Sequence, residues 1–179
     1  MYKRQEEDFV EHIFVENTHS YILFFTDKVK CYWVKVYDIP EGGRAAKGRA
    51  IVNLIGCEPD EKVSAFISVK EFNEDHYVVM ATEKGMVKKT KLSAYSNPRK
   101  KGIYAVEIRD GDRLIEARVS TGDNDILLGT RNGKSIRFSE EQIRASGRKT
   151  MGVKGITLSS EDDRLVGMLL IKREGTVLV

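Results

Sequence analysis

Short apolar runs recur along this chain, and each of them ends in a polar turn. The runs are rich in aromatic and β-branched side chains, which is typical of buried β-strands. They cover residues 21–26, 77–82 and 126–130. Lys84-Gly85 and Asn132-Gly133 follow the second and third runs, and glycine accepts the positive φ that a tight hairpin turn needs. Partly alternating segments come next, at 87–92 and 135–138, so the pattern predicts β-hairpins.

Two further landmarks follow in constant order, which indicates a repeat of about 50 residues. One is a basic loop that ends in lysine-glycine, with Gly48, Gly102 and Gly155 as the matched glycines. The other is an acidic turn that leads into an apolar strand. The strands expected after the basic loops and after the acidic turns cover 50–55, 103–108 and 155–158, and 63–69, 114–119 and 164–171. The helical signal is confined to residues 139–144, where Ser139 can cap a single turn.

These elements predict an all-β fold with four strands in each repeat. Four-stranded units of this length are typical of propeller-like arrays, in which each blade packs its faces against its neighbours. We expect about three complete blades, with repeat units at approximately 20–70, 76–120 and 124–172. Residues 9–15 and 174–179 have the pattern of strands from a preceding and a following blade. The chain is therefore expected to be an excerpt of a longer array.

Charge is distributed unevenly along the chain, although 30 basic and 27 acidic residues nearly cancel. Residues 41–51 carry +2, residues 96–104 carry +3 and residues 144–156 carry +4. These three basic loops sum to +9, so the rest of a chain with a net charge of +3 must carry −6. Lysine and arginine neutralise phosphates and release counterions, which gives affinity for nucleic acid without sequence preference. One basic loop for each blade therefore predicts a surface that holds duplex DNA along an arc.

The candidate DNA-binding residues are the cations of these loops, together with two cations at matched strand positions where the first repeat has Trp33. A solvated loop that binds nothing is the competing interpretation for any one of them, and their recurrence favours binding. Trp33 itself is expected to be a packing residue. The candidates are Arg44, Lys47, Arg49, Lys89, Arg99, Lys100, Lys101, Arg137, Arg144, Arg148, Lys149 and Lys154.

Composition and motifs argue against several other functions. A hydrophobic fraction of 41% and a charged fraction of 32% are typical of a soluble globular chain, and no apolar run has the length of a membrane span. Two cysteines are too few for a disulfide framework, which favours a reducing, cytoplasmic setting. The three histidines share no spacing, the acidic turns lack the calcium-loop pattern, and no phosphate-binding glycine loop follows a strand. We therefore expect no catalytic residue, no metal site and no cofactor within these residues.

Several segments resemble the C-terminal domain of the DNA gyrase A protein, and the stretch over residues 35–55 is the most specific of them. That stretch holds Lys35-Val36-Tyr37-Asp38-Ile39-Pro40-Glu41 and Arg44-Ala45-Ala46-Lys47-Gly48-Arg49-Ala50-Ile51. The segments Ala81-Thr82-Glu83-Lys84-Gly85-Met86 and Gly152-Val153-Lys154-Gly155-Ile156 are also similar to the family. The resemblance implies a β-pinwheel, a propeller-like disc of four-stranded blades that wraps double-stranded DNA round a positively charged rim.

The same resemblance implies a place in a larger enzyme. The partners would be the rest of the gyrase A protein and the gyrase B protein, and wrapping would support ATP-dependent negative supercoiling in the bacterial cytoplasm, at the nucleoid. ATP and magnesium would be used elsewhere in the holoenzyme, with no membrane involved. Alternatives are the matching domain of topoisomerase IV and a propeller that serves as a protein-interaction scaffold.

Two positions depart from the family pattern. The family's glutamine-arginine-arginine-glycine-glycine box has no counterpart in this sequence, so wrapping is expected to be weaker than in an intact domain. Val29 stands where the other repeats have Gly85 and Gly133, which leaves the geometry of the first hairpin turn open.

Overall fold

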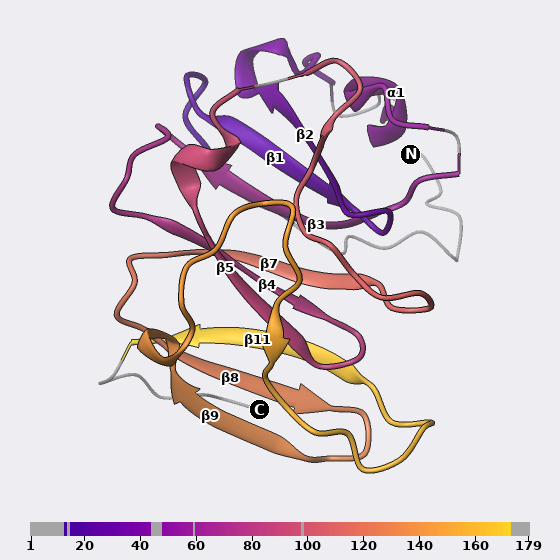
Figure 1. Cartoon of the computed structure of the whole chain (residues 1–179). Helices are drawn as coiled ribbons and strands as arrows, with labels where there is room; N and C mark the ends of the chain where they lie inside the picture. The colour runs from indigo at the N-terminus through magenta and orange to yellow at the C-terminus, as the bar shows by residue number, and fades with distance from the viewer. Residues whose placement is uncertain (1–12, 14, 44–47, 59, 98, 173–179) are drawn as a thin grey trace.

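Each apolar run becomes a strand inside a small antiparallel sheet in the computed structural model of the chain, which describes residues 13, 15–43, 48–58, 60–97 and 99–172. Three such sheets, which we call blades 1, 2 and 3, are stacked face to face in chain order (Figure 1). The all-β architecture predicted from the sequence is confirmed. Several strands begin and end where the apolar runs do, including β1 (Tyr21–Thr26), β3 (Val63–Val69) and β4 (Tyr77–Thr82).

The strand order is the same in blades 1 and 2 and, over the described residues, for the three strands of blade 3. Blade 1 has the order β3-β1-β2-β6, with β2 at Lys30–Lys35 and β6 at Ile103–Tyr104. Written in the same direction, blade 2 has the order β7-β4-β5-β10, with β7 at Leu114–Ser120, β5 at Met86–Lys91 and β10 at Val153–Lys154. Blade 3 has the order β11-β8-β9, with β11 at Leu165–Ile171, β8 at Asp125–Thr130 and β9 at Ser135–Ser139.

The fourth strand of a blade comes from the following repeat, which the sequence did not indicate. The two-residue strand β6 belongs to the second repeat but pairs with β2 of blade 1, and β10 of the third repeat pairs in the same way with β5 of blade 2. The strands expected at 103–108 and 155–158 are therefore wrong in extent and, for the second, in position. Consecutive blades are tied together because each closes its outer edge with its neighbour's chain.

The segment at 50–55, expected to be a strand, is mostly the helix α1 (Ile51–Ile55). It ends at Gly56, whose φ of 63° lies in the left-handed region and whose N–H donates to Val52 O. Ile55, with Leu54 beside it, packs in a cluster on the face of β1 that points away from blade 2. The segment can be helical because its apolar side chains cover a sheet face, while its backbone does not pair with a strand. Short 3-10 turns follow the second strand of each hairpin, at Val36–Asp38, Leu92–Tyr95 and Glu140–Gln142.

The single helical turn expected after Ser139 is confirmed, since Ser139 Oγ accepts the N–H of Glu141 at 3.3 Å. The matched glycines need a correction. Lys154 pairs with Met86 where Tyr104 pairs with Lys30, so the structural equivalent of Gly102 is Gly152, and Gly155 corresponds to Ala105. A Cβ on Gly152 would lie 2.4 Å from Val87 O, and this close approach explains why glycine is needed there.

All three hairpin turns share one geometry. Val29 adopts a φ of 57°, in the left-handed region where Gly85 and Gly133 have φ of 82° and 81°. This conformation is strained for a β-branched residue, and the buried Val29 side chain contributes to the core between blades 1 and 2. The turn that the sequence left open is therefore kept in the first repeat, with valine in place of glycine.

The acidic turns hold the hairpin turns in place by hydrogen bonds. Asp112 Oδ1 accepts the backbone N–H of Lys84 at 2.9 Å, and Asp163 Oδ1 accepts the N–H of Asn132 at 3.1 Å. Each carboxylate thereby fastens the hairpin turn of its own blade. Asp163 is buried, and Ser159 Oγ donates to it as well, at 2.6 Å.

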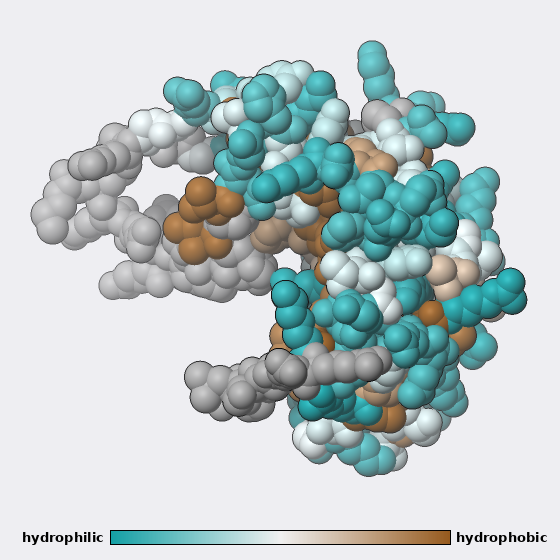
Figure 2. All heavy atoms as spheres, turned by 90° about the vertical axis from the view of Figure 1, so that its left-hand side faces the viewer, coloured by the Kyte–Doolittle hydropathy of each residue, from teal (hydrophilic) through white to brown (hydrophobic). Residues whose placement is uncertain are grey.

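Apolar side chains between the blades make up the core. One cluster lies between blades 1 and 2 and includes Trp33 among its partly buried members, and a second lies between blades 2 and 3. Figure 2 views the molecule from the left side of Figure 1 and shows hydrophilic side chains over most of this surface. Among the described residues no helix has the length and hydropathy to cross a membrane. Of the strands expected at 9–15 and 174–179, only Ile13 and Val15 are described, and both are exposed and outside any strand.

Candidate nucleic-acid interface

The basic loops of the second and third repeats lead into the outer edge strands β6 and β10, while the loop of the first repeat leads into α1. Arg99, Lys100 and Lys101 stand directly before β6, and all three are exposed. The loop of the third repeat runs in front of β5 before it forms β10 (Figure 1). Its cations Arg144, Lys149 and Lys154 are also exposed. The strand exchange described above therefore places each of these loops on the rim of the preceding blade, on the side away from β3 and β7.

None of the loop cations forms an ion pair within the part of the chain that the structure describes. Every ion pair found there uses a cation from outside the basic loops. Those paired cations are Lys28, Lys30, Lys89, Lys91, Arg113, Arg118, Arg137 and Arg164. The positive charge of the described basic loops is thus left uncompensated by carboxylates, while several exposed cations elsewhere, such as Lys62, Lys70 and Lys134, also lack an ion pair among the described residues.

Arg148 connects two consecutive basic loops. It is half-buried, and its guanidinium donates to Tyr104 O at 2.9 Å, so the loop of the third repeat is bound to strand β6 of the second. Two backbone contacts add to this: Glu107 N donates to Thr150 O at 3.2 Å, and Ser146 N donates to Lys89 O at 2.9 Å. The loop is consequently fixed on the blade at several points along its length.

Lys89 and Arg137 do occupy equivalent positions, opposite Val79 and Leu127 as Trp33 is opposite Leu23, but neither resembles the loop cations. Lys89 is buried, and its Nζ lies 2.9 Å from Glu140 Oε1 and 4.4 Å from the ring centroid of Tyr77. The half-exposed Arg137 holds Asp125 Oδ2 at 2.7 Å through both Nε and a terminal nitrogen. Lys89 cannot reach a ligand on the rim because it faces blade 3, and we leave both out of the interface.

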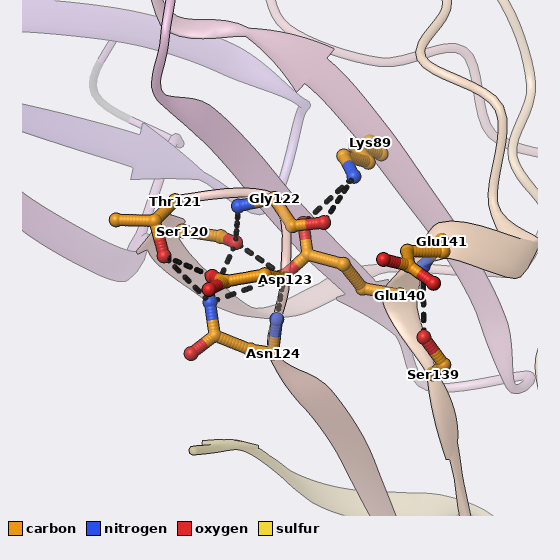
Figure 3. Close-up of polar contacts among 9 residues, drawn as sticks. All are labelled: Lys89, Ser120, Thr121, Gly122, Asp123, Asn124, Ser139, Glu140 and Glu141. Carbon is orange, nitrogen blue, oxygen red and sulfur yellow. Dashed lines mark hydrogen bonds and ion pairs between the residues drawn. The ribbon is translucent and has the colours of Figure 1, made fainter. Parts of the chain in front are cut away.

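Glu140 is the centre of a buried polar network at the junction of blades 2 and 3. Figure 3 shows its carboxylate between Lys89 and the turn that joins the two blades. Its Oε2 accepts from Ser120 Oγ and, at 3.2 Å, from Asn124 Nδ2. Ser120 Oγ in turn accepts the N–H of Gly122 at 2.9 Å. The network is structural, since it fixes the connection between the blades.

Of the remaining candidates, Arg49 is exposed just before α1, while Arg44 and Lys47 lie outside the residues that the structure describes. Lys88 was not among the candidates. It is buried on β5, and burial, with Arg148 nearby, lowers the pKa of Lys88 to about 8. Successive residues of a strand face opposite sides, so the sequence indicates that one of Lys88 and Lys89 points inward but not which of them. Over the described residues, no group of three metal-ligating side chains comes together.

The family model described as the DNA gyrase C-terminal domain, beta-propeller, matches the chain three times, over residues 20–70, 76–121 and 124–172. The chain belongs to the DNA gyrase C-terminal domain family. The β-pinwheel or propeller-like fold class expected from the sequence is confirmed by this match and by the stacked sheets. The matched segments coincide with blades 1, 2 and 3 except for the exchanged strands.

Curated gyrase proteins are similar to this member of the DNA gyrase C-terminal domain family. The DNA gyrase A protein of Clostridium acetobutylicum is 50% identical over 151 residues, which cover 84% of this chain and 18% of the relative. The DNA gyrase A protein of Salmonella typhimurium is 44% identical over 174 residues, which cover 97% of this chain and 20% of the relative. The chain thus spans about a fifth of the length of these relatives.

Solved structures of the DNA gyrase C-terminal domain family and its relatives share the fold. The C-terminal domain of DNA topoisomerase IV superposes with a TM-score of 0.78 at 30% identity, over 88% of this chain and 49% of that one. A DNA gyrase A C-terminal domain superposes with a TM-score of 0.73 at 23% identity, over 88% of this chain and 50% of that one, a likeness that concerns the fold alone.

Proposed function

We propose that this chain binds duplex DNA without strong sequence preference and bends it round the rim of the stacked blades, as a wrapping module of DNA gyrase. The clustering of exposed, unpaired cations in the described basic loops carries the proposal. No carboxylate pairs with them among the described residues, so they are left available to phosphates; they are Arg49, Arg99, Lys100, Lys101, Arg144, Lys149 and Lys154. Arg44 and Lys47 are proposed to join them from sequence alone.

Bending explains why the charge is spread over consecutive blades. A smooth bend of about 40–90° over a site of 20–30 base pairs costs about 1–6 kcal/mol, which phosphate contacts distributed along the arc must offset. A single strong patch would bind a straight duplex equally well. Basic loops on successive blade rims supply contacts at intervals, and the Arg148–Tyr104 hydrogen bond holds two of them at a fixed separation.

The wider role is proposed from the relatives. Within gyrase, wrapping on this surface would support ATP-dependent negative supercoiling together with the rest of the gyrase A protein and the gyrase B protein, in the bacterial cytoplasm at the nucleoid. ATP and magnesium would act elsewhere in the holoenzyme, and this chain would need no cofactor of its own. We place it in gyrase instead of topoisomerase IV because the curated relatives described above are gyrase A proteins at 50% and 44% identity.

Electrophoretic mobility shifts with long and short duplexes of unrelated sequence, at several salt concentrations, test the proposal. Affinity should rise with duplex length, because wrapping needs DNA that reaches several blades. The logarithm of the binding constant should fall linearly with the logarithm of salt concentration, by about 0.9 for each phosphate contact. A protein-interaction scaffold would show no binding at any length, and binding restricted to one sequence would also overturn the proposal.

A further inference from the structure

Lys88 lies beneath the tip of the third basic loop. It is only 3% exposed, and it points to the opposite side of β5 from Lys89, because successive strand residues face opposite ways. Its ammonium donates to Arg148 O, to Thr150 O at 2.8 Å and to Ala105 O at 3.4 Å. Two of these carbonyls belong to the loop and the third to the chain that follows β6, so one side chain joins three segments.

Every N–H donor of the Lys88 ammonium has an acceptor. A lysine ammonium has three N–H donors, and three carbonyl oxygens accept them. No carboxylate pairs with it among the described residues. Burying an unpaired cation is costly, so the arrangement persists only where the hydrogen bonds compensate. The carbonyls of Arg148 and Thr150 flank Lys149 in the chain, and the side chain of Lys149 is exposed.

In blade 1 the position under the basic loop holds no cation, and in blade 3 the equivalent position is apolar. Tyr32 and Ile136 occupy the positions equivalent to Lys88, opposite Phe24 and Leu128 as Lys88 is opposite Met80. In blade 1, the ring of Tyr32 packs so closely under Gly102 that a Cβ there would lie 2.8 Å away. Of the two blades whose rim carries a described basic loop, blade 2 alone holds it by hydrogen bonds to a buried ammonium, under the loop with the largest positive charge.

We propose that Lys88 is a positioning residue for DNA binding, which holds the turn at Arg148–Thr150 so that Lys149 faces the duplex. The inference rests on the proposed function, since a positioned loop has a role only if the rim binds DNA. Lys88 itself cannot contact a phosphate, because the loop covers it. Its contribution to affinity must pass through the loop.

The groups around Lys88 give this contact a pH dependence. Arg148 on the loop opposes its charge, Glu107 after β6 favours it, and the phenol of Tyr95 on the turn after β5 shares the Ala105 carbonyl at 3.1 Å. Burial lowers the pKa of Lys88 to about 8 and raises the pKa of Tyr95 far above its ordinary value. Lys88 therefore loses its proton between about pH 7 and 9, where exposed lysines stay charged.

The first test compares Lys88→Met with Tyr95→Phe in the 179-residue chain. Tyr95→Phe is a matched control, because it removes a buried donor to the same Ala105 carbonyl and leaves the turn untouched. In Lys88→Met without DNA, hydrogen exchange should quicken at the amides of Ser146 and Glu107, which bond Lys89 O and Thr150 O. Duplex affinity at about 0.1 M salt should fall about fivefold to tenfold, roughly what one lost phosphate contact gives, and stay within about twofold in the control.

Unchanged exchange and affinity in Lys88→Met would overturn the inference, and so would equal losses in both variants, which would mean general loosening. Failure of the wild-type chain to bind DNA would instead overturn the proposed function. The second test needs no lysine variant: affinity of the wild type and of Tyr95→Phe should weaken several-fold between pH 7 and 9 as Lys88 is deprotonated. A flat profile in both would contradict the positioning role even if Lys88→Met does not fold.

Discussion

The ammonium of Lys89 and the carboxylate of Glu140 lie 2.9 Å apart at the junction of blades 2 and 3, with side-chain exposures of 8% and 0%. At the junction of blades 1 and 2 the equivalent positions hold Trp33 and Leu92, both part of the apolar core there. The same joint between consecutive blades is thus apolar in one place and ionic in the next. Repeats that share a fold can therefore be joined either by apolar contacts or by a buried ion pair.

This pair predicts a strongly non-additive mutant series. Lys89→Met or Glu140→Leu alone leaves a buried charge without its partner, and each should lower the free energy of unfolding by about 3–5 kcal/mol. The double variant removes both charges and imitates the apolar junction, so it should recover most of that loss. Urea denaturation of the wild type, both single variants and the double variant measures the coupling.

The pair Lys91–Glu74 is a suitable control, because its charged atoms lie at a similar distance, 2.8 Å, but its side chains are 52% and 66% exposed. Single substitutions there should change the free energy of unfolding by less than about 1 kcal/mol. Losses that simply add in the buried pair would show that Lys89 and Glu140 do not depend on one another.

Asp163 predicts a loss of stability in acid. Hydrogen bonds from Ser159, foremost its hydroxyl, and from the N–H groups of Asn132 and Arg164 hold the pKa of Asp163 well below its ordinary value. A carboxyl whose pKa is lower in the folded state stabilises the fold above its unfolded pKa of about 4 and loses that contribution as pH falls further. The denaturation midpoint of the wild type should accordingly decrease below about pH 4.

Asp163→Asn isolates this contribution. The amide keeps one acceptor oxygen but turns an NH₂ group toward the Ser159 donors, so the variant should be less stable at pH 7 and lose less stability between pH 5 and 3 than the wild type. Asp162→Asn, at the exposed neighbouring residue, is the matched control and should follow the wild type. Parallel pH profiles for Asp163→Asn and the wild type would refute the assignment.

The sequence predicted those parts of the fold that depend on local pattern. The apolar composition at 21–26, 63–69 and 77–82 places β1, β3 and β4 correctly, because β1 and β4 lie inside their sheets with both faces buried and β3, at a sheet edge, buries one apolar face. The strand exchange was missed because two-residue strands such as β6 and β10 carry no periodicity of their own. The basic loops were found for a different reason, since clustered charge is visible without knowledge of any partner.

Lys89 shows what local pattern cannot provide. Its carboxylate partner belongs to the next repeat, and nothing in the composition of β5 indicates that both faces of this strand are covered. Lys88 is missed for the same reason, because the third basic loop that buries it is distant in sequence. A buried lysine and an exposed one look alike in sequence, and only the stacking of blade 3 on one side and the third basic loop on the other separates them.

Gly152 predicts a steric control of the same loop. A Cβ at Gly152 would lie 2.4 Å from Val87 O and 2.8 Å from the Val87 carbonyl carbon, and backbone atoms of a sheet cannot move aside. Gly152→Ala should therefore displace β10 from β5, cost about 1–3 kcal/mol of stability and weaken duplex binding. Gly147→Ala, in the same loop but with open space around the new Cβ, should leave both within measurement error. Equal behaviour of the two variants would show that the loop does not depend on this close contact.

The rim cations predict a loss of affinity that is independent of DNA sequence. Arg99→Gln, Lys100→Gln and Lys101→Gln together remove three exposed charges without removing an ion pair of the described residues. If all three contact phosphates, the slope of the logarithm of affinity against the logarithm of salt should become shallower by about 2.7.

The control for this triple variant has the same net charge. Lys62→Gln, Lys70→Gln and Lys134→Gln neutralise three exposed lysines outside the basic loops, so long-range attraction falls equally while the rim is preserved. Its salt slope should stay near that of the wild type, on several unrelated duplexes. If both triple variants lost the same affinity, total charge would account for binding and the rim would have no special role. If only one DNA sequence were affected, the residues would be reading bases, because phosphate contacts are the same in every duplex.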